Sequence, residues 1–63
     1  MEYPEAKRRA LRHAEYAQRE VKVWYSLDNC TWIIEIYKDV MEVKPDWDLR
    51  YIAYPDGDFK KNG

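Results

Sequence analysis

The fold is decided by residues 21–37, whose sequence is VKVWYSLDNCTWIIEIY. Up to Leu27, β-branched and aromatic residues alternate with other residues at a period of two, which is the pattern of a strand. Asp28 and Asn29 then supply side chains that tolerate the backbone angles of a tight turn. A second β-rich run follows them. We therefore predict a β-hairpin with strands at residues 21–27 and 31–37.

The segment before the hairpin has the composition of a helix. Pro4 suits the first helical turn, and residues 5–12 are nearly all strong helix formers. Apolar side chains recur at spacings of three or four, which places them in one stripe. The stripe consists of Tyr3, Ala6, Ala10, Ala14, Ala17 and Val21. We predict a helix over residues 4–20 that approaches its partner surface closely, because most of the stripe is alanine.

After the hairpin, Pro45 and the acidic residues beside Trp47 stop the second strand. Residues 49–54 have strand composition, and residues 55–58 combine Pro, Asp and Gly in a turn. We expect Phe59 to dock on the core and residues 60–63 to fray.

These elements predict a single α+β domain over residues 1–63. One N-terminal helix would pack on a three-stranded antiparallel β-meander, in the order α-β-β-β. A sheet must bury its apolar face, and one helix is present to cover it. We expect the helix to lie across an apolar set on that face: Val23, Tyr25, Trp32, Ile34 and Ile36.

Composition narrows the class of protein. The formal net charge is −1, with a basic excess in residues 1–27 and an acidic excess in residues 28–63. This balance weakens any argument from bulk charge to a nucleic-acid partner. The chain has no apolar run of membrane-spanning length and no signal-peptide pattern. Together with a single cysteine, these features predict a cytoplasmic protein.

Catalytic and metal-binding patterns are weak. Cys30 and His13 are the one possible nucleophile and base, and nothing in the sequence brings them together. One Cys and one His are too few for a zinc site or a disulfide. Asp46, Asp48, Asp56 and Asp58 are typical turn residues and lack the spacing of a calcium loop. We therefore predict that the protein is not an enzyme and holds no metal or cofactor.

One face of the predicted helix is rich in arginine. Four basic side chains and one aromatic side chain share this face: Arg8, Arg9, Arg12, Arg19 and Tyr16. Arginines can contact phosphates, and tyrosine can stack on a base. The same pattern also suits a solvated helix face, and the neighbouring glutamates would repel a polyanion. Nucleic-acid binding through this face is therefore an alternative function.

The sheet face away from the helix is the second candidate surface. Alternation places Trp24, Ile33 and Tyr37 there, joined from the third strand by either Tyr51 or the pair Ile52 and Tyr54. A sheet covered by one helix normally shows water a polar second face. An apolar, aromatic face indicates a binding surface, unless the Phe59 segment or the loop carrying Trp47 folds over it.

We accordingly predict a small, non-catalytic protein-binding or regulatory module. Its binding residues would be those of the outer sheet face: Trp24, Ile33, Tyr37, Tyr51 and Tyr54. The partner would be a second copy of the chain or another protein. The size also suits a small accessory or inhibitor protein of the phage type.

Overall fold

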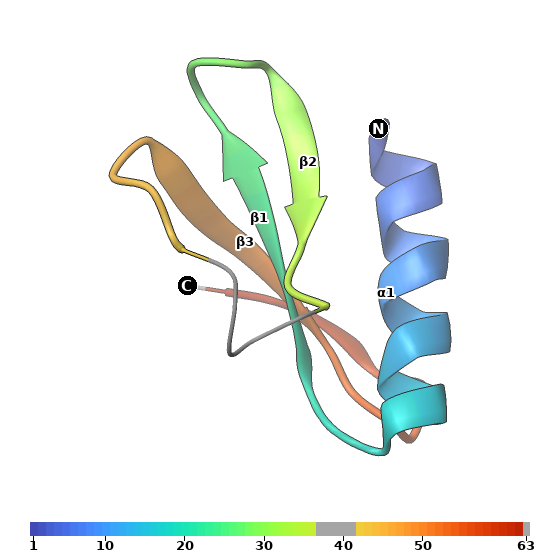
Figure 1. Ribbon diagram of the computed structural model, residues 1–63. Coiled ribbons are helices and arrows are strands. Elements are labelled where there is room, and N and C mark those ends of the chain that lie inside the picture. The colour runs from blue at the N-terminus through green and yellow to red at the C-terminus, as the bar shows by residue number, and fades with distance from the viewer. Residues whose placement is uncertain (37–41, 63) are drawn as a thin grey trace.

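The computed structural model describes residues 1–36 and 42–62. The elements are one helix, α1 (Tyr3–Ala17), and four strands, β1 (Val21–Ser26), β2 (Thr31–Ile34), β3 (Trp47–Ala53) and β4 (Phe59–Lys61). The strands form one antiparallel sheet in the order β2-β1-β3-β4, with α1 packed against it (Figure 1). The predicted α+β class is confirmed, and the predicted three strands are one too few.

Helix α1 is held to the sheet by its alanine stripe. Ala6, Ala10 and Ala14 are fully buried, so this part of the stripe is confirmed, whereas Ala17 is exposed. The helix ends three residues earlier than predicted, because Gln18 adopts a left-handed conformation with φ of 54°. The Gln18 amide donates to the Ala14 carbonyl and closes the last turn. Among the described residues, no helix is long and apolar enough to cross a membrane.

The sheet is not the predicted meander, because β3 pairs with β1 rather than with β2. Strand β1 therefore occupies the interior of the sheet, where both of its backbone edges are bonded. It is suited to that place, since Val21 and Val23 are buried and a central strand has neighbours on both sides to pack against. Strand β4 forms one edge and carries Lys60 and Lys61, and charged side chains of this kind protect an edge from unwanted pairing.

The core lies between α1 and the sheet. Its sheet side consists of Val21, Val23, Ile34 and Ala53, all nearly or fully buried. Small helix residues facing β-branched strand residues let the backbones approach and fill the space without large voids. The predicted inner-face residues lie here: Trp32 and Ile36 pack against this core, and the Tyr25 ring lies 5.0 Å from that of Trp32.

A cluster of aromatic rings extends the core around the first residues of α1. The Tyr3 ring centroid lies 5.4 Å from those of Trp32 and Tyr51, and the Tyr51 ring stacks on that of Phe59 at 4.8 Å. Burial, with help from the neighbouring Tyr51 hydroxyl, raises the pKa of the Tyr3 phenol. Phe59 thus docks on the core as predicted.

Other boundaries differ from those predicted. Residues 60–61 belong to β4 instead of fraying, because Phe59 anchors the segment and the Asn62 amide donates to the Arg50 carbonyl. Strand β2 ends at Ile34, and β3 begins two residues earlier than predicted, at Trp47. Tyr37, which we placed in the second strand, lies outside the described residues.

Candidate functional site

The outer face is the side of the sheet away from α1, and pairing of the strands shows which side chains share it. Trp24 lies opposite Ile33 on β2 and opposite Leu49 on β3, while Ser26 lies opposite Trp47. Directly opposed residues in antiparallel strands point to the same face. Five large apolar side chains therefore form what we call the outer patch: Trp24, Ile33, Trp47, Leu49 and Ile52.

A β-bulge determines which β3 side chains reach the outer face. Val23 pairs with Tyr51 and Trp24 pairs with Leu49, so Arg50 is the extra residue. Tyr51 consequently lies on the inner face against Tyr3. Of the two alternatives predicted for the third strand, the one with Tyr51 outward is wrong, and the one with Ile52 outward agrees with the pairing. Ile52 is the outer residue, opposite Lys22. Leu49, on the other side of the bulge, is also on the outer face, a position that we did not predict.

Within the outer patch, Trp24 is the central contact. Its ring lies 6.3 Å from the ring of Trp47, and its indole nitrogen donates a hydrogen bond of 3.1 Å to the Glu35 carboxylate. All five side chains of the patch are half-buried. The chain therefore shields this face in part, and the Trp47 contact is one source of that shielding, as the alternative to a binding surface anticipated.

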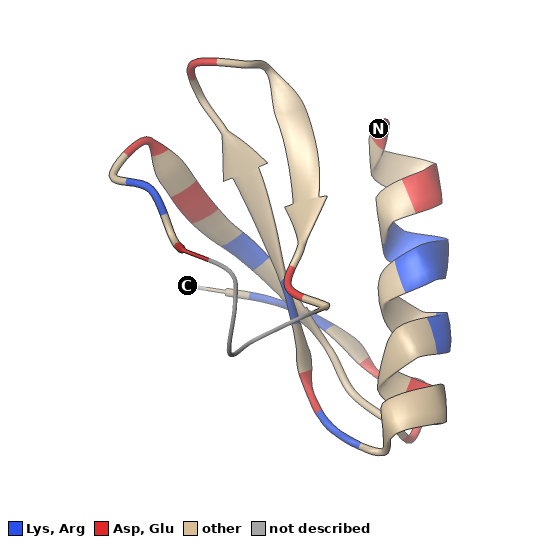
Figure 2. Cartoon of the chain, viewed as in Figure 1, with Lys and Arg blue, Asp and Glu red and all other residues tan. Residues whose placement is uncertain are grey.

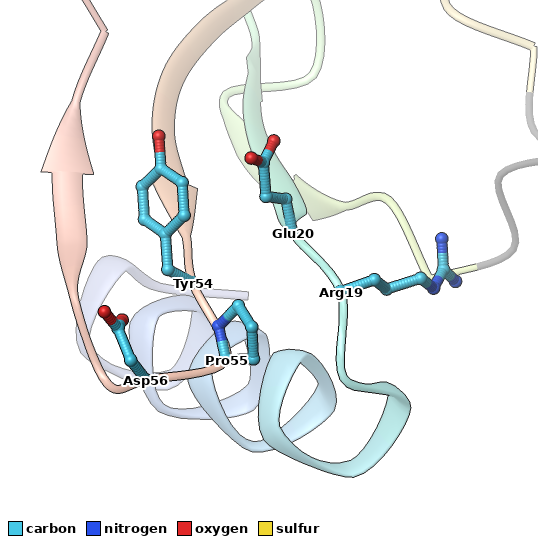
Figure 3. Close-up of a pocket in the computed structure, with 5 residues that line it drawn as sticks. All are labelled: Arg19, Glu20, Tyr54, Pro55 and Asp56. Atoms are coloured by element: carbon cyan, nitrogen blue, oxygen red, sulfur yellow. The ribbon is translucent and has the colours of Figure 1, made fainter.

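The other predicted outer residue, Tyr54, lies just past the end of β3. The Lys60 ammonium group lies 5.5 Å from the centre of its ring. Tyr54 also lines an open depression of about 610 Å³ with Arg19, Glu20, Pro55 and Asp56. Figure 3 shows Tyr54 and Glu20 at this depression and the Arg19 side chain pointing away from both.

A buried serine ties the outer face to the loop that precedes β3. Ser26 is fully buried and donates a 2.8 Å hydrogen bond to the Asp46 carboxylate. The Asp28 amide donates to the same oxygen at 3.4 Å. The hydrogen bond from Ser26 is the main cause of the lowered pKa of Asp46, because it stabilises the charged form of the carboxylate. We call this the Ser26–Asp46 clamp, which joins the β1–β2 turn to the start of β3.

The arginine face is only partly assembled as predicted. Arg8, Arg9 and Arg12 are exposed on α1, and Figure 2 shows basic positions in blue along this helix. Arg9 forms an ion pair of 2.8 Å with Glu5. Arg19 does not belong to this face, because the helix has already ended and its guanidinium donates to the Ile36 carbonyl.

Tyr16 is the most exposed large hydrophobic side chain of α1, with 89% of its surface exposed. Together with Arg12 and His13 it lines a depression of about 290 Å³. Arg12 and Tyr16 are four residues apart and therefore lie on neighbouring turns of the same side. This grouping offers a positive charge next to a flat ring.

The possible nucleophile and base are far apart along the fold. Cys30 lies in the β1–β2 turn. This turn is near the first residues of the chain, since the Met1 ammonium group donates a hydrogen bond to the hydroxyl of the adjacent Thr31. His13 is ten residues further along the helix than Tyr3, a distance of about 15 Å. No group of three potential metal ligands occurs in residues 1–36 and 42–62.

Comparison of the chain with protein family models, with curated proteins and with solved structures finds no match.

Proposed function

We propose that the protein is a small, non-catalytic binding module that recognises another protein chain through the outer patch. The observation that supports this proposal is the apolar character of a sheet face over which no described helix packs. Tryptophan is the residue that most often dominates protein interfaces, and two tryptophans contact each other here. The half-buried side chains would gain further burial in a complex.

The composition of this face also resembles that of an interface. A large apolar centre is bordered by charged residues, with Lys22 and Glu35 beside Trp24 and Lys60 beside Ile52. Protein interfaces have an apolar centre and a polar rim. The single cysteine suits a reducing compartment, and we place the function in the cytoplasm.

The test replaces apolar patch residues by lysine and compares binding of purified partner proteins. Ile33→Lys and Leu49→Lys each put a charge into the patch and should abolish binding. Tyr16→Lys makes the same kind of change on α1 and should leave binding intact. Thermal melts establish that each variant is folded. If a purified partner binds the patch variants as well as the parent, the outer patch is not the binding surface.

Nucleic-acid binding through α1 is the second candidate function. It is favoured by one observation, the exposed Tyr16 ring beside Arg12 in a shared depression. A base could stack on the ring while arginines contact phosphates. The limited number of free arginines, with Arg9 paired to Glu5, makes this candidate weaker than the first.

The salt dependence of binding tests this candidate. A labelled single strand and a labelled duplex are titrated at low and moderate salt, since phosphate contacts release counterions and weaken as salt rises. Arg8→Glu with Arg12→Glu should abolish the binding, whereas Lys61→Glu on β4 should not. Failure of both nucleic acids to bind at low salt would reject this candidate.

A further inference from the structure

The depression beside Tyr54 is a part of the surface to which the proposed function assigns no role. Its volume is about 610 Å³, which lies within the usual range of ligand sites, about 300–1,000 Å³. Small-molecule sites enclose most of their ligand, whereas this depression is open. An open site suits a side chain that enters from another protein.

Pairing of the strands fixes the position of its two main walls. Val21 lies opposite Ala53, so Glu20 and Tyr54 are neighbours at the ends of β1 and β3. The turn that follows is ordered, because the Gly57 amide donates a hydrogen bond of 3.1 Å to the Tyr54 carbonyl. The Tyr54 ring is therefore held next to an exposed carboxylate, and Figure 3 shows the two side chains along the depression.

The charge that lines the depression is mainly negative. The carboxylates of Glu20 and Asp56 line it, and neither forms an ion pair within residues 1–36 and 42–62. The Arg19 guanidinium donates to the Ile36 carbonyl and points away from the depression in Figure 3. The two carboxylates are therefore not neutralised by this arginine, and the depression is complementary to a cation.

The Tyr54 ring already accepts a cation within the folded chain. The Lys60 ammonium group lies 5.5 Å from the centre of the ring, and such contacts arise because the face of an aromatic ring is negative. Strand β3 lies between β1 and β4, so Lys60 approaches the ring from the β4 side and Glu20 lies on the β1 side. A cation between Glu20 and the ring would contact both.

We infer that this depression receives an arginine side chain of the partner protein. The inference rests on the proposed function for the partner's being a protein. A guanidinium group is planar, so it stacks on a tyrosine ring and also forms paired hydrogen bonds with a carboxylate. Tyr54 and Glu20 supply these two contacts, and Asp56 adds negative charge beside them. Tyr54 follows Ile52 of the outer patch by two residues, about 7 Å along a strand, so one partner reaches both.

The first test uses N-acetyl-arginine amide as the probe and follows the backbone amides by NMR. The signals of Glu20, Tyr54 and Asp56 should move together, with a dissociation constant on the order of 10 mM, because a single exposed cation gains little from an open site. N-acetyl-citrulline amide has nearly the same shape without the charge and should not bind. N-acetyl-lysine amide should bind more weakly than the arginine probe, because an ammonium group has no flat face to stack.

Two variants remove the two contacts separately. Glu20→Gln should weaken binding of the arginine probe about threefold, and Tyr54→Leu should weaken it by about the same factor. Glu15→Gln and Tyr16→Leu make the same changes on α1 and should leave binding intact. Thermal melts establish that the variants are folded. Glu20 is exposed, so Glu20→Gln serves if Tyr54→Leu fails to fold.

The second test uses a purified protein that binds through the outer patch. Its affinity should fall about threefold in Glu20→Gln and stay unchanged in Glu15→Gln. If the arginine probe binds but Glu20→Gln leaves the affinity of the partner unchanged, the depression takes free guanidinium compounds and the inference is overturned.

The remaining outcomes separate this inference from the proposed function. Equal shifts with the arginine and citrulline probes, or arginine binding that withstands Glu20→Gln and Tyr54→Leu, overturn the inference. Binding that appears only in Lys60→Gln overturns it as well, because Lys60 then fills the depression itself. The proposed function fails by a different result, a partner that binds Ile33→Lys as well as the parent.

Discussion

The two faces of the sheet bury different kinds of side chain. On the inner face, the buried residues are all apolar, and alanines of α1 lie directly on Val21, Val23 and Ile34. On the outer face, the large apolar side chains are half-buried, and the fully or nearly buried residues are polar, Ser26 and Glu35. Each polar residue has a defined hydrogen-bond partner.

The two kinds of buried group contribute differently to stability. Close packing of apolar groups contributes most of the free energy of folding. Buried polar groups contribute less net stability, because their bonds replace bonds to water, but leaving one unsatisfied is costly. The inner face is therefore built to hold the fold together. The outer face carries directional groups, Ser26 and Glu35, each with a hydrogen-bond partner within the chain.

The largest expected effect comes from truncating the aromatic cluster of the inner face. Trp32→Ala removes ring contacts with Tyr3, Tyr25 and Tyr51 and should lower the free energy of unfolding by about 3 kcal/mol. A domain of this length has about 3–9 kcal/mol in total, so much of the protein would unfold. Urea denaturation measures the change.

The comparison for that variant is Ile33→Ala. Ile33 is the next residue along β2, but it lies on the outer face. Ile33→Ala should lower the free energy of unfolding by about 1 kcal/mol, because both side chains are half-buried and the isoleucine side chain removes less apolar area from water than the tryptophan ring. A larger loss for Ile33→Ala than for Trp32→Ala would show that the outer face, not the inner one, holds the fold together.

The second expected effect concerns the close approach of α1. Ala10 is fully buried, so Ala10→Leu should force the helix away from the sheet and lower the free energy of unfolding by about 2 kcal/mol. Ala17→Leu introduces the same side chain at an exposed position and should change it little. Thermal melting distinguishes the two. Equal stability of both variants would mean that α1 does not need its alanines.

Much of this inner face could be predicted from the sequence. The alanine stripe and the alternation of Val21 and Val23 are periodic patterns, and periodicity reports directly which side chains share a face. The order of the strands could not be predicted in the same way. Whether β3 joins β1 or β2 depends on how the long connection after β2 crosses the sheet, and local sequence carries little information about this.

The outer patch was predictable only in part. Trp24 and Ile33 follow from alternation within one hairpin. Leu49 and Trp47 do not, because the bulge at Arg50 shifts the phase of β3, and because the acidic residues beside Trp47 suggest a turn. Alternation of Trp47, Asp48 and Leu49 was the available signal. Strand β4, with three residues, is too short to show a period.

A smaller effect is expected from the Ser26–Asp46 clamp. Ser26→Ala removes the hydroxyl that donates to Asp46 and accepts from the Asn29 amide. It should lower the free energy of unfolding by about 1 kcal/mol, less than Trp32→Ala. Amide exchange measured by NMR should become faster in the β1–β2 turn and leave α1 unaffected. Faster exchange in α1 as well would mean that the clamp supports the whole fold.

The smallest expected effect is the pH dependence that this clamp produces. The hydrogen bond from Ser26 lowers the pKa of Asp46, and the Asp28 amide adds to this, while partial desolvation opposes it. A group with a lowered pKa in the folded state binds its proton more readily when unfolded. Its contribution to stability is therefore fully present above the unfolded pKa of 3.8. That contribution is lost as the pH falls through the lower, folded value.

Other carboxylates titrate in the same range, so the measurement is a difference between variants. Urea denaturation of the parent, Ser26→Ala and Asp46→Asn is followed from about pH 6 down to about pH 2. The parent should lose more stability over this range than either variant, because each variant removes the source of the shift. The pH-dependent part of the difference between the parent and each variant should vanish at the acidic end, where Asp46 is protonated in folded and unfolded chains alike. Parallel curves for the parent and Ser26→Ala would show that the serine does not set the pKa of Asp46. The clamp would then be a neutral contact, and the polar character of the outer face would rest on Glu35 alone.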